Sequence, residues 1–125
     1  MFHLLYIGIG GFIGAVSRYL VSRYISNLVP VFPLGTLTVN VLGSFVLGFL
    51  IYSVTAGRNI SPEMRDFIAI GILGGFTTMS SFAYESFRLI ELNQVMLFAL
   101  NVALNIILCI AAIYAGKELA LIIAK

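Results

Sequence analysis

Four long stretches without a charged residue constrain the fold of this chain more than any other feature. They run over Leu4–Ser17, Leu34–Gly57, Phe67–Tyr84 and Leu92–Gly116. A helix needs about 20 residues, with a range of about 17 to 25, to cross the hydrocarbon of a bilayer. The last three stretches meet this requirement directly, and the first meets it only if Arg18 lies within its helix. The sequence therefore predicts four membrane-spanning helices.

The composition supports a membrane protein. Hydrophobic residues make up 61% of the 125 residues and charged residues only 10%, whereas soluble domains average about 45–50% and about 25%. The first stretch lacks a basic amino-terminal flank, so a retained helix is favoured over a secretory signal. We expect one four-helix transmembrane domain over residues 1–125. The net charge of +2 is too small and too scattered to indicate nucleic-acid binding.

The basic residues give little orientation bias. Four spans place both termini on one side, where the Lys and Arg residues are Arg58, Arg65, Lys117 and Lys125. The other side carries Arg18, Arg23 and Arg88. Because Lys and Arg near helix ends set membrane orientation, two interpretations stay open. Either helix-specific effects select one orientation, or the chain inserts both ways and forms an antiparallel dimer.

Small or polar residues recur at every fourth position, and residues four apart share a helix face. The three stripes are Gly10, Gly14 and Arg18; Thr36, Asn40, Ser44 and Gly48; and Asn101, Asn105 and Cys109. For the glycines we expect close helix packing, since small residues let helix backbones approach in lipid. The amide of Asn40 is costly to leave unpaired there. Either neighbouring helices satisfy it, or it faces water and a transported species.

The third stretch contains an unusual segment, "GGFTTMSSFAYES" (74–86). Glycine lowers helix propensity by about 1 kcal/mol relative to Ala, and the Thr and Ser hydroxyls compete for backbone partners. Such a segment predicts a helix break near the membrane midplane, where free backbone groups often bind ions. A simple kink relieved by the hydroxyl residues is the alternative.

Further along this segment, two pairs of residues are spaced three apart and so lie on shared helix faces. Met79 and Phe82 share a helix face just beyond the predicted break. The edge of an aromatic ring is electropositive, so Phe82 presented edge-on could stabilise an anion, although ordinary packing is the alternative. Glu85 and Arg88 are also three apart, and we expect them to form an ion pair rather than an active site.

Motifs of enzymes are missing from the sequence. His3 is the only histidine, which rules out a histidine-based metal cluster or catalytic triad within one chain. The segment "GIGGFIG" approaches the dinucleotide pattern G-x-G-x-x-G, but Ile13 stands where the third glycine is required. An enzyme is therefore not expected.

Three segments closely resemble the Fluc family of fluoride channels: "GGFIGAVSRY" (10–19), "GTLTVNVLGSFVLG" (35–48) and "GGFTTMSSFAYES" (74–86). The resemblance implies an all-α membrane protein that forms an antiparallel, dual-topology homodimer. It further implies two fluoride pores per dimer, a structural sodium ion at the dimer centre, and passive export of fluoride. The expected location is the plasma membrane, which is the inner membrane in a bacterium.

The resemblance also implies roles for individual residues. The expected fluoride pathway comprises Asn40, Phe82, Met79, Thr36, Ser80, Ser81 and Arg18. Among these, Arg18 would lie at the aqueous entrance of the pore. The backbone carbonyls of Gly74 and Thr77 would bind the sodium ion.

The chain departs from the family pattern at Met79, where a phenylalanine is usual, because methionine has no ring edge. Cys109 stands near a position where some relatives carry serine. The nearest alternative is a small dual-topology multidrug or cation transporter, which exchanges cations through a buried acidic residue. No Asp or Glu precedes Glu63, so the first two spans carry none, and this counts against the alternative.

Overall fold

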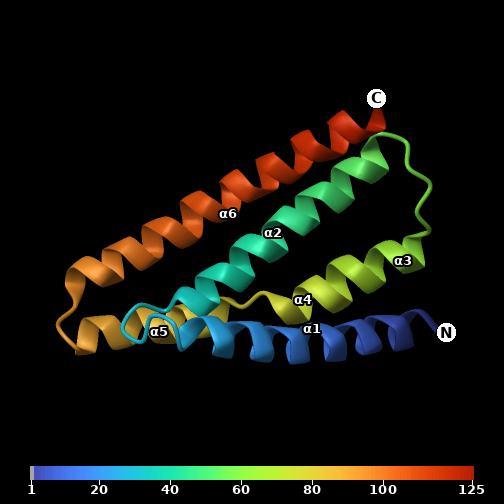
Figure 1. The fold of residues 1–125 in the computed structure, drawn as a ribbon. Coiled ribbons are helices and arrows are strands. Elements are labelled where there is room, and N and C mark those ends of the chain that lie inside the picture. The colour runs from blue at the N-terminus through green and yellow to red at the C-terminus, as the bar shows by residue number, and fades with distance from the viewer. Residues whose placement is uncertain (1) are drawn as a thin grey trace.

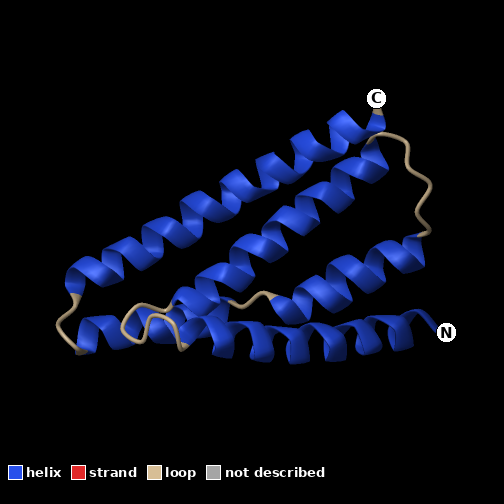
Figure 2. Cartoon of the chain, viewed as in Figure 1, coloured by secondary structure: helices blue, strands red, loops and turns tan. Residues whose placement is uncertain are grey.

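The computed structural model describes residues 2–125, and all their regular structure is helical (Figure 2). Four helical segments are long and apolar enough to cross a membrane, namely Phe2–Ser26, Leu34–Thr55, Pro62–Glu91 and Val95–Ala124. They coincide with the four predicted stretches. Arg18 lies inside the first segment, which is the condition that this stretch had to meet.

The first, second and fourth segments are single helices: α1 (Phe2–Ser26), α2 (Leu34–Thr55) and α6 (Val95–Ala124). The third segment consists of α3 (Pro62–Asp66), the π-helix η1 (Phe67–Ile72), α4 (Leu73–Phe76) and α5 (Met79–Glu91). Both termini and the α2–α3 connection lie at one end of the bundle, and the other two connections lie at the opposite end (Figure 1).

Turn and cap residues explain where the helices begin and end. Pro30 and Pro33 lie in the connection before α2, and Gly57, with φ of 101°, follows its last turn. Pro62 occupies the first turn of α3, where its missing N–H costs nothing. The hydroxyl of Ser61 accepts a hydrogen bond from the N–H of Met64 at 3.2 Å and so caps this helix.

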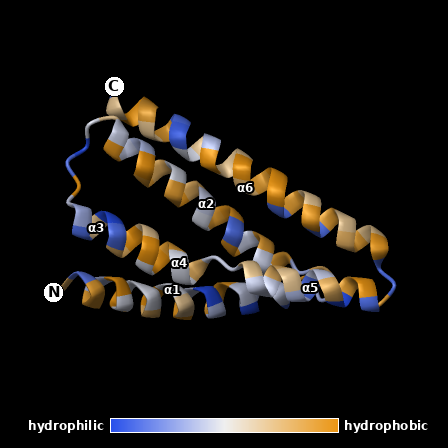
Figure 3. Cartoon of the chain, turned by 180° about the vertical axis from the view of Figure 1, so that it is seen from behind, coloured by the Kyte–Doolittle hydropathy of each residue, from blue (hydrophilic) through white to orange (hydrophobic). Residues whose placement is uncertain are grey.

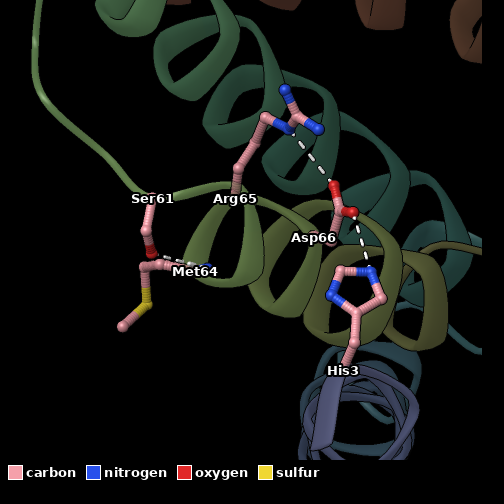
Figure 4. A network of polar contacts seen from close by, with 5 residues as sticks. All are labelled: His3, Ser61, Met64, Arg65 and Asp66. Carbon is pink, nitrogen blue, oxygen red and sulfur yellow. Dashed lines mark hydrogen bonds and ion pairs between the residues drawn. The ribbon is translucent and has the colours of Figure 1, made fainter. Parts of the chain in front are cut away.

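A small polar network joins α1 to α3 at the same end of the bundle (Figure 4). Nε2 of His3 lies 3.1 Å from Oδ2 of Asp66, and Nε of Arg65 donates to Oδ1 of Asp66 at 3.2 Å. Asp66 is therefore held between a residue of its own helix and the first turn of α1.

Close glycine contacts hold the helices in two pairs, α2 with α6 and α1 with η1 and α4. A Cβ atom on Gly10 would lie 2.6 Å from the carbonyl oxygen of Phe67, and one on Gly48 would lie 2.5 Å from that of Ile113. Neither site has room for a side chain. The expectation that the glycine stripes serve close helix packing is confirmed.

The outward faces of the helices are strongly apolar. Leu4, Phe12 and Met96 are examples of large hydrophobic side chains that are mostly exposed. Hydrophobic residues predominate along the helices, while hydrophilic residues gather mainly towards the two ends of the bundle (Figure 3). So much exposed apolar surface is typical of a protein covered by lipid or by another subunit.

Candidate functional site

Two extended residues, Thr77 and Thr78, separate α4 from α5. Their φ and ψ angles are −87° and 159° for Thr77, and −152° and 124° for Thr78. The hydroxyl of Thr77 donates to the carbonyl of Leu73 at 2.9 Å, and the hydroxyl of Thr78 accepts from the N–H of Ser81 at 3.2 Å. The two threonines thus satisfy the end of one helix and the start of the next, as hydroxyl side chains commonly do.

Asn40 of α2 binds the backbone of this extended segment. Its Oδ1 accepts a hydrogen bond from the N–H of Thr78 at 2.8 Å, and its Nδ2 donates to the carbonyl of Thr78 at 3.1 Å. Nδ2 also donates to Oδ1 of Asn105 at 3.1 Å. Both N–H donors of Asn40 are thereby used within the chain, so neighbouring helices satisfy the amide, which was the first of the two alternatives.

The hydrogen bonds continue from Asn40 through α6 to α5. Nδ2 of Asn105 donates to the carbonyl oxygen of Asn101 at 2.9 Å and to its Oδ1 at 3.0 Å. Nδ2 of Asn101 donates to the hydroxyl of Ser86 at 2.9 Å. Asn101, Asn105 and Ser86 are all buried. We call the connected set Asn40, Asn105, Asn101 and Ser86 the amide relay.

Arg18 lies beside the same extended segment. Its Nε donates to the carbonyl of Gly75 at 2.9 Å, close to the end of α4, and its side chain is partly buried. A cation at the carboxyl end of a helix is favourable because the free carbonyls there carry partial negative charge. The expected position of Arg18 at the aqueous entrance of a pore stays a prediction.

Glu85 has a different partner from the one expected. The hydroxyl of Thr36 donates to Oε1 of Glu85 at 2.5 Å, while Arg88 pairs with Glu91 at 3.3 Å. The predicted Glu85–Arg88 ion pair is therefore wrong. Both residues instead line a hollow of about 210 Å³ beside the connection between α1 and α2. Arg88 has an acidic residue three positions away on either side. Glu85 is bound by Thr36 of α2, and Arg88 pairs with the exposed Glu91 instead.

A larger cleft of about 470 Å³ lies between α2, η1, α4, α5 and α6. Of the residues expected in the ion pathway or the sodium site, Asn40, Gly74, Thr77, Met79 and Phe82 line it. Three members of the polar stripes, Ser44, Asn105 and Cys109, also line it. The side chain of Met79 is 74% exposed, so it is free to contact whatever occupies this cleft.

The remaining residues expected in the fluoride pathway lie outside the lining of this cleft. Thr36 is buried against Glu85, and Arg18 lies at the end of α4. Ser80 is exposed and Ser81 is half-buried, and both belong to the first turn of α5. The structure thus gathers three of the seven expected pathway residues around one cleft and leaves the other four beyond it.

The backbone carbonyls of Gly74 and Thr77 differ from their neighbours. The carbonyls of Leu73, Gly75 and Thr78 all accept hydrogen bonds from side chains. Within residues 2–125, no hydrogen bond of this segment reaches the carbonyl oxygen of Gly74 or Thr77. Free carbonyls at the end of α4 and on the extended segment that follows it are the kind of ligands that unwound transporter helices offer to sodium.

Other metal chemistry finds no support in the described part of the chain, which contains no group of three or more His, Cys, Asp or Glu side chains able to hold a metal ion. The oxygens that the break and its neighbours offer include those of backbone carbonyls and amide side chains. Hard cations such as sodium accept such neutral oxygen ligands.

Sequence reasoning identified the polar stripe of α6 but missed its partners. The spacing of Asn101 and Asn105 placed them on one face of the helix. Nothing in the spacing indicated that Ser86 and Asn40 would meet that face, or that Glu85 would bind Thr36.

Comparisons with known proteins agree on one family. The family model described as "CrcB-like protein, Camphor Resistance (CrcB)" matches residues 5–117. A "Fluoride-specific ion channel FluC 1" of Methanosarcina acetivorans is 48% identical over 124 residues, which cover 99% of this chain and 95% of the relative. A FluC channel of Methanosarcina barkeri is 46% identical over 121 residues, which cover 97% of this chain and 92% of the relative. A FluC channel of Shewanella woodyi is 42% identical over 120 residues, which cover 95% of this chain and 96% of the relative.

Proposed function

Because this chain belongs to the CrcB-like family, we propose that it forms a fluoride-selective ion channel of the plasma membrane. The single observation that carries the proposal is the near-full-length identity with proteins named fluoride-specific channels. The apolar outer faces and the four long helices fit a multi-pass membrane protein.

The chemistry of the cleft suits a small, strongly hydrated anion. Its polar lining comes from amides, hydroxyls and backbone, with Phe82 beside them, and it contains no charged side chain. An uncharged hydroxyl such as that of Ser44 and the ring edge of Phe82 can replace part of the water around fluoride, whereas the amide donors of Asn40 and Asn105 are bound within the chain. A charged partner such as arginine would hold the ion too tightly, whereas conduction requires that the ion can also leave.

We propose that fluoride leaves the cell passively through this channel. Fluoride enters acidified cells as neutral hydrogen fluoride and dissociates near neutral pH. The resulting anion is trapped inside. A negative-inside potential then drives it outward, with a free-energy gain of about 2.3 kcal/mol per 100 mV. Such export would protect the cell from fluoride toxicity.

The proposed assembly is an antiparallel homodimer with two pores. The cleft of one chain is open at its side, and Met79 is largely exposed there, so a second copy could complete the wall. The proposed pathway follows Asn40, Met79 and Phe82. It continues past Thr36, Ser80, Ser81 and Arg18 beyond the cleft.

A sodium ion at the centre of this dimer would be held by backbone oxygens. The free carbonyls of Gly74 and Thr77 fit that role, since each subunit would contribute two. Sodium would supply a fixed positive charge between the uncharged central stretches, residues 67–84, of the two broken helices. In this way it would stabilise their approach.

Cation transport is the second candidate, and one observation favours it. Glu85 is a partly buried acid in the third span, bound to Thr36 at 2.5 Å, and small cation exchangers depend on a buried acid. The relatives named above argue for the fluoride channel instead.

Efflux from loaded liposomes distinguishes the two functions. Purified protein should release fluoride but not chloride from vesicles once a potassium ionophore balances the charge. Proton-coupled movement of an organic cation in the same vesicles, without fluoride release, would favour the second candidate. Vesicles without protein provide the baseline for both measurements.

A further inference from the structure

The amide of Asn40 is arranged to hold the backbone of the extended segment. It pairs with both polar groups of Thr78, accepting from the N–H at 2.8 Å and donating to the carbonyl at 3.1 Å. This is the pairing that one peptide group makes with another in a sheet. One side chain thereby contacts two consecutive peptide groups, the one before Thr78 and the one after it.

The planarity of the peptide bond extends this hold to Thr77. The N–H of Thr78 and the carbonyl of Thr77 belong to the same trans peptide unit, in which they point in opposite directions. Because Asn40 fixes the N–H, it also fixes the direction of the Thr77 carbonyl. Within the described residues that carbonyl accepts no hydrogen bond, so the bond from the Thr78 N–H to Asn40 is the only hydrogen bond that restrains this peptide unit.

The amide relay in turn fixes Asn40. Its second N–H is bound by Oδ1 of Asn105, whose own amide is held by Asn101. Asn101 is 1% exposed and Asn105 is 6% exposed, so water does not compete for these bonds. A buried, fully paired amide network of this kind is rigid.

We infer that Asn40 is a positioning residue: held by Asn105, it sets the orientation of the Thr77 carbonyl instead of donating its own N–H groups to the transported ion. Where the inference concerns sodium, it rests on the proposed function, because the oriented carbonyl is then a ligand of that ion. Asn40 would couple the wall of the cleft to the cation site at its edge.

The test uses Asn105→Leu and Asn40→Asp in the full-length protein purified in detergent micelles. Asn105→Leu removes the partner that holds Asn40 but leaves Asn40 itself in place. Asn40→Asp loses the donor to the Thr78 carbonyl. The control is Thr38→Val, which removes a hydrogen bond to the carbonyl of Leu34 in the same helix, 2.7 Å long and remote from Thr78.

Two readouts that do not depend on flux are measured. Hydrogen exchange of the Thr78 amide, followed by NMR with nitrogen-15 threonine, should become at least about tenfold faster in Asn105→Leu, because local opening controls exchange. Asn40→Asp keeps the oxygen that accepts from this N–H, so it is assessed by its sodium dependence alone. The sodium concentration that half-maximally raises the unfolding temperature should increase by about tenfold or more, as is usual when an outer-shell partner of a metal ligand is lost. Thr38→Val should change neither quantity.

The inference would be overturned if Asn105→Leu showed wild-type exchange and both variants showed wild-type sodium dependence while fluoride flux was lost. That result would assign Asn40 a direct contact with the ion. Should Asn40→Asp not assemble, Asn105→Leu decides alone. Failure of the proposed function is a separate result, namely wild-type vesicles that retain fluoride, and it leaves the exchange measurement interpretable.

Discussion

At the scale of single residues, Phe82 and Met79 form the aromatic and thioether part of the cleft wall. They lie three residues apart on α5 and therefore on one face. Phe82 is half-buried whereas Met79 is 74% exposed. Because of this difference in exposure, the two residues are expected to respond differently to substitution.

Replacing Phe82 by Ile should abolish fluoride conduction while leaving the protein assembled. Isoleucine fills much of the same space but has no electropositive ring edge. We expect fluoride efflux from liposomes to fall by at least about tenfold, which corresponds to about 1.4 kcal/mol, with an unchanged elution volume in size-exclusion chromatography. Phe12→Ile on the exposed face of α1 is the control. Normal conduction in Phe82→Ile would remove the ring from the pathway.

Replacing Met79 by Phe should preserve fluoride flux, with at most a changed rate. The site is exposed enough to accept a ring without displacing the backbone, and phenylalanine restores the pair that is usual in the family that the sequence resembles. Initial rates of efflux from liposomes provide the measurement. Complete loss of flux at normal expression would mean that the pathway of this chain is arranged around the thioether.

At the scale of elements, the glycine contacts between α1 and η1 determine how closely these helices approach. A Cβ atom on Gly10 would meet the carbonyl oxygen of Phe67. A Cβ atom on Gly8, two residues earlier in the same helix, would have no atom within 4 Å. The two glycines therefore have opposite expected responses to the same substitution.

Gly10→Ala should destabilise the protein by about 1–3 kcal/mol, because a methyl group pressed against backbone forces the helices apart. Gly8→Ala should stabilise it by up to about 1 kcal/mol, since alanine is the better helix former and nothing opposes it. Unfolding in detergent, followed by circular dichroism, measures both. Equal effects of the two substitutions would show that the close contact of α1 with η1 is not required.

Sequence periodicity predicted the helices and their small-residue faces, but not which faces meet. Arg18 lies within α1 as required, and the stripe through Gly10 does pack closely. The contact between Asn40 and Thr78 joins residues far apart in the chain. It depends on the relative rotation of two helices, which a repeat of four residues within one helix does not encode. The Thr36–Glu85 bond was unpredictable for the same reason.

At the scale of the whole molecule, the fold separates the basic residues into two groups. Arg58, Arg65, Lys117 and Lys125 lie towards the end that carries both termini. Arg23 and Arg88 lie towards the other end, while Arg18 is partly buried at the end of α4. Orientation depends on basic residues near the helix ends, and Arg18 is not at such an end. Without Arg18, the difference in basic residues between the two ends is somewhat larger than the sequence alone indicates.

An antiparallel dimer nevertheless requires comparable numbers of chains in both orientations, and labelling of one loop residue tests this directly. Cys109, the only cysteine, is replaced by Ser, and the exposed loop residue Asn59 by Cys. A membrane-impermeant maleimide applied to intact cells should label about half of the protein, because each orientation puts this loop on a different side. The remainder should react only after the membrane is permeabilised.

A cysteine at Asn93, in the connection at the opposite end of the bundle, should give the same proportions. Complementary labelling, with nearly all of one loop and almost none of the other accessible from outside, would mean a single orientation, and the two-pore antiparallel assembly would then be excluded.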